Sequence, residues 1–266
     1  NPGRFTGFEN LMAAYGYTLQ IYCDFSGYTD IAIGVALLLG FRLPVNFNSP
    51  YKSKNITEFW QRWHISLTNW FRDYMFLPIA YFLSDRLKKE KYYGMRTESM
   101  IYLICTLVVF LVCGLWHGPR INFVIWGGIH GVALVIHKFY SRHRRQKRKK
   151  KPNQFLPWLF TLHFIVLTWV VFRVDGWDNF NLMTGRIFTA FHPELILQVI
   201  SAYSSVFLVM IAGFAIHWIP QIRKENIKSV FIGMSEPVRF FIILALVILI
   251  YQLRSSGIVP FIYFEF

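Results

Sequence analysis

The chain has 266 residues, of which 55% are hydrophobic, 19% are aromatic and only 16% are charged, and its mean hydropathy is +0.37. This composition excludes an ordinary soluble protein and predicts several membrane-spanning helices. Nine of the 28 Lys and Arg residues lie between Lys138 and Lys151 without an acidic residue, and they account for most of the net charge of +14. Because no folded soluble module surrounds this cluster, we do not expect the chain to bind nucleic acid.

The first apolar stretch, residues 11–41, carries Asp24 near its centre and Tyr28 one helical turn later. A carboxylate within an apolar helix is costly unless it is paired, and Arg62 and Arg72 are the partners that we expect for it. A structural ion pair and a catalytic role explain Asp24 equally well, so both interpretations stay open.

Residues 40–84 do not have the pattern of a plain spanning helix. Pro44 and Pro50 predict an extended, turn-rich stretch. The sequence Asn55-Ile-Thr-Glu58 then offers caps for a helix that would run through residues 59–74. This helix carries four charged or titratable residues among its tryptophans: Arg62, His64, Arg72 and Asp73. Their mixture with aromatic residues predicts a segment buried against other helices, or re-entrant from one face, rather than one facing lipid.

Five further apolar stretches without charge, or nearly so, follow along the chain: Ser99–Gly118, Ile121–Ile136, Phe155–Phe172, Leu195–Ile219 and Phe240–Leu253. The first of them ends at His117, beside Gly118 and Pro119. Pro119 disfavours the helical region for the residue before it, so a membrane helix must end or bend here. Irregular backbone at membrane depth survives only where protein buries it or where it lines a wet cavity. The imidazole at this break is therefore a candidate functional group.

The distribution of Lys and Arg predicts the orientation in the membrane. We expect the basic loop 141–154 to be cytoplasmic, because short cytoplasmic loops carry an excess of Lys and Arg. By alternation of the spans, the basic loops 84–98 and 221–236 then fall on the same side and the C-terminus falls outside. A second interpretation of loop 141–154 is a docking surface for anionic lipid or for a phosphate-rich ligand.

Each histidine in an apolar environment also has a structural interpretation. His117 ends its helix, where a positive charge would favour the helix dipole. His64, taken alone, fits a buried hydrogen-bonded side chain, and His130 lies on a helix face thinned by glycine, as close helix packing requires. No pair of histidines has the i, i+4 spacing and no Cys/His cluster occurs, so the sequence predicts no metal site.

A lone buried histidine can nevertheless perform one kind of chemistry. Desolvation keeps its imidazole neutral near pH 7 and therefore able to accept a proton. It could deprotonate a hydroxyl as that hydroxyl attacks a thioester carbonyl, which is general-base acyl transfer. Such a reaction needs neither a metal nor a bound cofactor nor a nucleophilic serine, and the chain has no Gly-x-Ser-x-Gly motif.

An ordered set of motifs along the whole chain resembles the membrane-bound O-acyltransferase family. The similarity is greatest to the bacterial branch that contains the membrane subunit of alginate O-acetylation, and somewhat lower to the D-alanine exporters of teichoic acids. The motifs are Tyr22–Tyr28, Leu39–Pro44, Asn46–Asn48, Phe59–Leu67, Trp70–Tyr74, Gly114–Gly118, Trp126–Gly131, Phe172–Val174 and Pro260–Phe264. One departure is Leu77–Tyr81, which replaces a Gly-Gly turn common in the family.

The resemblance implies an all-α, polytopic transmembrane bundle with re-entrant or broken helices around a central funnel. Residues 1–266 would form a single integral-membrane domain that lacks the N-terminal helices of the family. The essential histidine of the family falls on His117 and its second histidine on His64. The expected pocket or supporting residues are Trp116, Arg72, Asp73, Asp24, Tyr28 and His130.

The same resemblance implies a function in the bacterial inner membrane. A cytoplasmic thioester donor, acetyl-CoA or an acyl carrier, would supply an acyl group, expected to be acetyl, for O-acetylation of an exported cell-envelope polysaccharide. The expected partner is an extracytoplasmic acetyltransferase of the SGNH type. Two other classes stay open: a transporter or channel with an intramembrane His/Asp/Arg relay, and a non-catalytic scaffold for the outer acetyltransferase.

Overall fold

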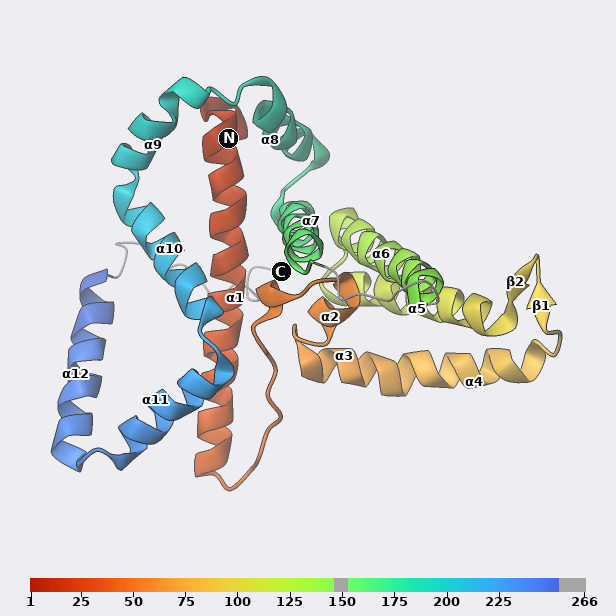
Figure 1. Cartoon of the computed structure of the whole chain (residues 1–266), viewed down its shortest axis with the longest axis horizontal. Helices are drawn as coiled ribbons and strands as arrows, with labels where there is room; N and C mark the ends of the chain where they lie inside the picture. The colour runs from red at the N-terminus through yellow and green to blue at the C-terminus, as the bar shows by residue number, and fades with distance from the viewer. Residues whose placement is uncertain (146–152, 254–266) are drawn as a thin grey trace.

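The computed structural model describes residues 1–145 and 153–253, which are almost entirely helical (Figure 1). The centre of the basic loop 141–154 and the terminal motif Pro260–Phe264 lie outside the described residues. The elements are η1 (Pro2–Arg4), α1 (Gly7–Leu38), η2 (Pro50–Lys52), α2 (Ile56–Trp60), α3 (Ile65–Phe71), η3 (Arg72–Phe76), α4 (Leu77–Arg86), β1 (Lys91–Tyr92), β2 (Met95–Arg96), α5 (Thr97–Trp116), α6 (Ile121–Arg145), α7 (Phe155–Arg173), α8 (Trp177–Thr189), η4 (Pro193–Leu195), α9 (Ile196–Ala202), α10 (Ser204–Trp218), α11 (Gln221–Gly233) and α12 (Glu236–Leu253).

Four helices in the described part of the chain are long and apolar enough to cross a membrane: α1, α5, α6 and α7. A fifth crossing results if the segment from η4 to α10 is one span that is bent by 90° between α9 and α10. The predicted all-α membrane class with broken helices is therefore confirmed. In Figure 1, α5–α7 lie on one side of α1, and the chain from α9 to α12 lies on the other.

The apolar stretch 195–219 is long enough to cross a membrane, but it does not form one straight helix. The helix stops at Ala202, and Tyr203 takes a non-helical conformation (φ −110°, ψ 29°) before α10 begins. No proline or glycine marks the break, because neither residue type occurs between positions 196 and 212. The hydropathy pattern is continuous across this segment and does not predict the bend, which is a feature of the folded chain.

The prediction of one continuous helix over residues 59–74 is wrong, because two separate helices form there. Its N-terminal cap lies where it was expected, since the Asn55 side chain accepts a hydrogen bond from the Glu58 N–H at 2.8 Å. The helix ends after one turn at Trp60, and the chain restarts as α3 after His64, whose backbone is left-handed (φ 42°, ψ 55°).

Residues 46–48 and 62–65 pair through backbone hydrogen bonds, and this pairing stabilises the interruption of the helix at His64. The Ile65 N–H donates to the Asn46 carbonyl at 3.0 Å, and the Asn48 N–H donates to the Arg62 carbonyl at 2.9 Å. Backbone groups around the break are therefore satisfied by residues 46–48 rather than by a continuous helix. Tertiary pairing overrides the local helical preference here.

Helices α5 and α6 form an antiparallel hairpin in which glycines bring the two backbones into contact. A Cβ atom on Gly127 would lie 2.1 Å from the Phe110 carbonyl oxygen, and one on Gly114 would lie 2.3 Å from the Phe123 carbonyl oxygen. Close approach of this kind maximises van der Waals contact between membrane helices, where burial from water contributes little. The hairpin is the rigid support of the break at His117.

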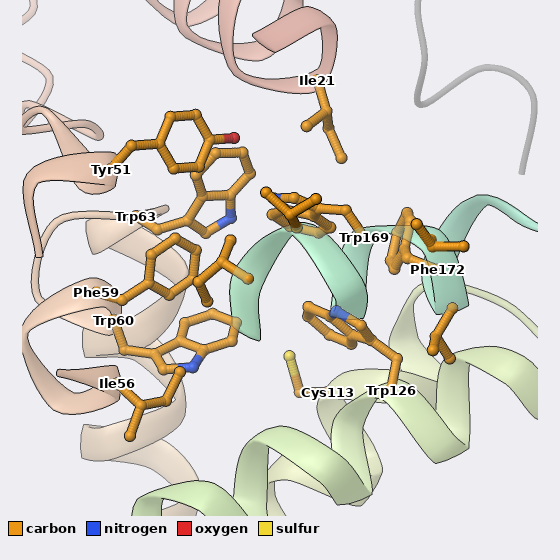
Figure 2. Close-up of a cluster of buried hydrophobic side chains, with 14 of the residues drawn as sticks. Ile21, Tyr51, Ile56, Phe59, Trp60, Trp63, Cys113, Trp126, Trp169 and Phe172 are labelled. Atoms are coloured by element: carbon orange, nitrogen blue, oxygen red, sulfur yellow. The ribbon is translucent and has the colours of Figure 1, made fainter. Parts of the chain in front are cut away.

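A cluster of aromatic side chains fills the space where α2, the Trp63 region, α6 and α7 meet (Figure 2). The Trp63 and Trp169 rings lie 4.9 Å apart, and Trp126 stacks on Trp169 at 5.8 Å. Phe59 stacks on Trp63, with ring centroids 5.7 Å apart. Such pairs each contribute about 0.5–1.5 kcal/mol beyond the burial of their surface. The cluster fixes α2 against the hairpin.

Candidate functional site

His117 is the C-cap residue of α5: its N–H donates to the Gly114 carbonyl at 3.1 Å, and the Gly118 N–H donates to the Leu115 carbonyl at 3.1 Å. The helix ends here as predicted, because Gly118 follows with φ 143°, a conformation that L side chains rarely adopt. The imidazole of His117 is 8% exposed. It sits in an aromatic box, with ring centroids of Trp116 at 4.9 Å, Phe172 at 5.0 Å and Trp126 at 5.3 Å.

The Phe172 wall of this box is held by a residue that the sequence analysis did not weigh. The Asn122 side-chain amide donates to the carbonyls of Val171, Phe172 and Val174, at 3.2 to 3.3 Å. These carbonyls end α7 and have no partner within the helix. Asn122 therefore ties the start of α6 to the end of α7, next to His117.

His64 lies at the other break, and its hydrogen bonds determine its tautomer. The Asn46 Oδ1 atom accepts from the Ser66 N–H at 3.1 Å and from the Ser66 hydroxyl at 2.9 Å, and it lies 3.1 Å from His64 Nδ1. A backbone N–H can only donate, so the contacting atom of Asn46 is its oxygen and His64 Nδ1 carries the proton. In the neutral ring the lone pair is then on Nε2, which is the basic atom.

The side chain of Trp116 joins the two histidines. Its ring centroid lies 4.9 Å from that of His117 and 6.4 Å from that of His64. The structure thus brings together three predicted site residues from two breaks that are 53 positions apart in sequence. Phe25 of α1 closes the far side of His64, with ring centroids 4.8 Å apart.

Both imidazoles lie outside the spanning helices, in the connections, and burial keeps both of them neutral. Desolvation lowers the pKa of His64 to about 4. Desolvation, with a smaller contribution from the charge that His64 would carry, lowers the pKa of His117 to about 3. Each ring is therefore a proton acceptor, rather than an imidazolium, at neutral pH.

His130 belongs to the packed core. Its Nδ1 atom accepts from the Trp60 indole N–H at 3.2 Å. Its Nε2 atom lies 3.1 Å from the Thr168 hydroxyl, which already donates to the Ile165 carbonyl at 2.9 Å, so Nε2 is the donor. Both nitrogens are satisfied and the side chain is fully buried. This arrangement favours the structural interpretation of His130 over a role in proton transfer.

The charged residues predicted for the site, Arg72 and Asp73, pair with each other. Arg72 forms a bidentate ion pair with its neighbour Asp73, at 2.7 and 3.1 Å, on the exposed π-helical turn η3. Arg62 pairs with Glu58 at 2.8 Å. The two arginines expected as partners of Asp24 thus have their ion pairs with carboxylates close to them in sequence.

Asp24 and Tyr28 lie one turn apart on α1, as expected, with Asp24 half-buried and Tyr28 52% exposed. Phe25, on the same turn of α1, contacts the ring of His64, with centroids 4.8 Å apart. This turn of α1 therefore reaches the site through Phe25. Asp24 and Tyr28 stay predictions as supporting residues.

A cavity of about 310 Å³ lies between α2, α3, η3 and α5. Arg72 borders it, and Cys113, one turn before His117, lies in its wall. The other residues that line it are mostly apolar: Thr57, Trp60, Gln61, Leu67, Thr68, Phe71, Phe76, Tyr102, Thr106, Val109, Phe110 and Leu134. Of the predicted site residues, Arg72 therefore lines this apolar cavity, whereas His117, His64, Trp116 and Asp73 do not.

In the described ranges 1–145 and 153–253, no three His, Cys, Asp or Glu side chains come together as metal ligands would.

Fold and site define a class: a polytopic helical membrane protein whose neutral histidines are gathered at breaks between helices. Sequence comparisons extend this description. The family model for the membrane-bound O-acyltransferase family matches residues 5–174, so the chain belongs to that family. This range ends with the last residues of the His117 box, just after α7.

Three curated relatives illustrate the similarity. The peptidoglycan O-acetyltransferase of Helicobacter pylori is 42% identical over 63% of this chain and 29% of its own length. The probable alginate O-acetylase AlgI of Pseudomonas putida is 31% identical over 96% of this chain and 53% of its own length. The teichoic acid D-alanyltransferase of Bacillus subtilis is 33% identical over 61% of this chain and 40% of its own length. The chain thus spans about a third to a half of the length of these relatives, and it falls in the AlgI-like branch that its motifs indicate.

Proposed function

We propose that this chain carries the catalytic histidines of a membrane O-acyltransferase, which moves an acetyl group from a thioester donor toward a cell-envelope polysaccharide. The observation that carries the proposal is the meeting of His117 and His64 on the ring of Trp116. Membership of the acyltransferase family and relatives that are named for O-acetyl and D-alanyl transfer support it. They favour transfer chemistry over a transporter or a scaffold.

The chemistry follows from two neutral imidazoles that are shielded from water. As a hydroxyl oxygen bonds to the acyl carbon, His117 accepts the hydroxyl proton and the carbon–sulfur bond breaks. The proton then returns through the imidazole to the departing thiolate, so the enzyme ends unchanged. His64 lies across the Trp116 ring with a basic Nε2 atom and serves as the second proton acceptor. Holding donor and acceptor in one pocket supplies much of the remaining acceleration.

The cellular setting completes the proposal. Residues 1–266 form one integral-membrane domain of the bacterial inner membrane, with the loop 141–154 cytoplasmic and the C-terminus outside. Acetyl-CoA or an acyl carrier approaches from the cytoplasm, and the acetyl group leaves through a central funnel to an extracytoplasmic acetyltransferase of the SGNH type. The acceptor is an exported polysaccharide, as the peptidoglycan and alginate substrates in the names of the relatives suggest.

Glycan ester analysis of a deletion strain tests this proposal. The strain is complemented with the wild-type protein as the cell makes it, with His117→Ala, or with His192→Asn. His192 is a surface histidine paired with Glu194 at 2.9 Å, and asparagine tolerates its left-handed backbone (φ 52°). We expect wild type and His192→Asn to restore O-acetylation and His117→Ala to lose it at an unchanged protein level. Wild-type acetylation by His117→Ala would refute the assignment.

Two further outcomes separate the alternatives. Substrate flux in proteoliposomes without any acyl transfer would identify a transporter or channel. Tolerance of both His117→Ala and His64→Ala, with loss of acetylation only on deletion of the protein, would identify a scaffold. Neither outcome is expected if the two histidines perform the transfer.

A further inference from the structure

The loops that carry Asn46 and His64 form one unit, and polar bonds at Tyr51 anchor this unit to the spanning helices. Ser49, just before this anchor, has a left-handed backbone (φ 45°), as His64 does (φ 42°). Non-glycine residues persist in this conformation only where surrounding contacts hold them. The contacts that hold the unit against the spanning helices therefore matter for the position of the His64 ring.

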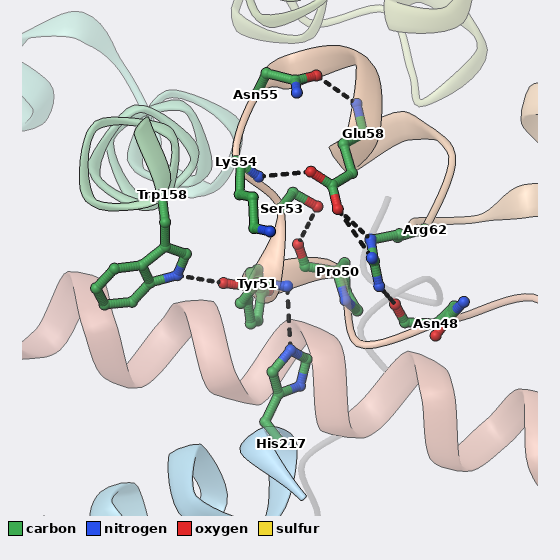
Figure 3. Close-up of polar contacts among 10 residues, drawn as sticks. All are labelled: Asn48, Pro50, Tyr51, Ser53, Lys54, Asn55, Glu58, Arg62, Trp158 and His217. Carbon is green, nitrogen blue, oxygen red and sulfur yellow. Dashed lines mark hydrogen bonds and ion pairs between the residues drawn. The ribbon is translucent and has the colours of Figure 1, made fainter. Parts of the chain in front are cut away.

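Tyr51 is bonded to three helices at once, and Figure 3 shows its bonds to His217 and Trp158. Its N–H donates to His217 Nε2 of α10 at 3.1 Å, and its carbonyl accepts from the Trp158 indole N–H of α7 at 2.9 Å. Its hydroxyl donates to the Thr18 carbonyl of α1 at 2.6 Å. Both Tyr51 and His217 are 2% exposed, so these bonds lie in the protein interior, where they are strongest.

The bond from Tyr51 to His217 provides an acceptor for a backbone N–H that has no partner within its own helix. Tyr51 lies in the first turn of η2, directly after Pro50, and the N–H groups of a first turn have no partner within the helix. A neutral imidazole supplies the missing acceptor, which most side chains of an apolar helix cannot do. Lys52 adds a second bond to the same helix end, from Nζ to the Ile219 carbonyl at 3.1 Å.

Four residues, 47–50, separate Tyr51 from Asn46, which supports the ring of His64. Asn46 Oδ1 accepts from His64 Nδ1, and the Arg62 guanidinium donates to the Asn48 carbonyl at 3.0 Å while it pairs with Glu58. A displacement of Tyr51 would move the attached segment and so turn the ring of His64. Positioning errors of about 1 Å in such groups cost on the order of 100-fold in rate.

We infer that His217 is a positioning residue for acyl transfer: it holds the Tyr51 backbone, and through Asn46 it orients the proton-accepting nitrogen of His64. This inference rests on the proposed function. It also gives α10, which lies after the residues that the family model matches, a defined part in the site.

The test compares three α10 variants of the protein as the cell makes it. His217→Leu removes the acceptor, whereas His217→Gln keeps one near the place of Nε2. Phe214→Leu is the matched control, because Phe214 lies one turn earlier on α10 and contacts Tyr15, at 6.4 Å, rather than Tyr51. We expect kcat to fall on the order of 10- to 100-fold in His217→Leu with the donor KM within about twofold, and to recover largely in His217→Gln. Phe214→Leu should keep wild-type kcat.

Two additional measurements keep the inference falsifiable if His217→Leu folds poorly. Trp158→Phe removes the indole N–H that bonds to Tyr51 while keeping an aromatic ring at this position, and it should also lower kcat, by a smaller factor. In a double-mutant cycle, His217→Leu with Asn46→Ala should be no slower than Asn46→Ala alone, because both act through His64. Independent, multiplicative losses would overturn the inference, as would full kcat in His217→Leu. An inactive wild type, or an active His117→Ala, would instead refute the proposed function.

Discussion

Two adjacent glycines of α6 should respond in opposite ways to the same substitution. A Cβ on Gly127 would lie 2.1 Å from the Phe110 carbonyl oxygen and 3.2 Å from the Gly114 nitrogen, so α5 and α6 must separate by about 1 Å to accept alanine. A Cβ on Gly128 would meet only the end of the Leu111 side chain, at 3.7 Å, which is an ordinary contact.

The magnitudes follow from these contacts. Overpacking of this kind costs about 1–3 kcal/mol, whereas alanine in place of glycine within a helix stabilises by about 0.5–1 kcal/mol. Gly127→Ala should therefore unfold at a lower temperature than the wild type, and Gly128→Ala at the same or a higher one. Separation of α5 from α6 also moves Trp126 relative to His117, now 5.3 Å away, so Gly127→Ala should acetylate poorly.

Thermal unfolding of the purified protein in detergent, followed by size-exclusion chromatography, measures the first effect, and glycan ester analysis measures the second. Each variant adds one methyl group, and the two positions are neighbours. The two proteins therefore have the same composition and hydropathy. Equal melting temperatures for Gly127→Ala and Gly128→Ala would refute the close packing of α5 on α6 described above.

Three other predictions follow from the site. Because the folded pKa of His64, about 4, lies below its ordinary value of 6.5, its neutral form contributes stability that is fully present above pH 6.5 and is lost as the pH falls toward 4. Denaturation at pH 7 and pH 5 should reveal this loss, on the order of 1 kcal/mol per pH unit, and it should shrink in His64→Gln; an identical loss in both proteins would contradict the burial of His64. Thr168→Val leaves the buried Nε2–H of His130 without its acceptor and should lower the unfolding free energy by about 1–3 kcal/mol; an unchanged unfolding free energy would contradict this bond. Gly118→Ala places a side chain at φ 143° and 3.1 Å from the Phe123 ring, so we expect acetylation to fall at an unchanged protein level, and normal acetylation would show that the turn after His117 tolerates a Cβ.

Hydropathy and the Gly118-Pro119 signal are local properties, and the features that depend on them could be predicted. The spans of α5, α6 and α7, the helix end at His117 and the cap at Asn55 need only the preferences of a few neighbouring residues. Membership of the acyltransferase family also lies in the motifs themselves. These features do not require knowledge of any distant contact.

The other features depend on groups that are far apart in the chain. The break at His64, the meeting of His64 with His117 on Trp116, and the bond from Tyr51 to His217 across 166 positions arise only on folding. The bond between His130 and Trp60, 70 positions apart, likewise arises only on folding. The sequence alone determined which residue types are present and where the chain can cross a membrane. Tertiary structure decided which polar groups satisfy one another, because a buried donor bonds to whichever acceptor the packed helices bring within reach.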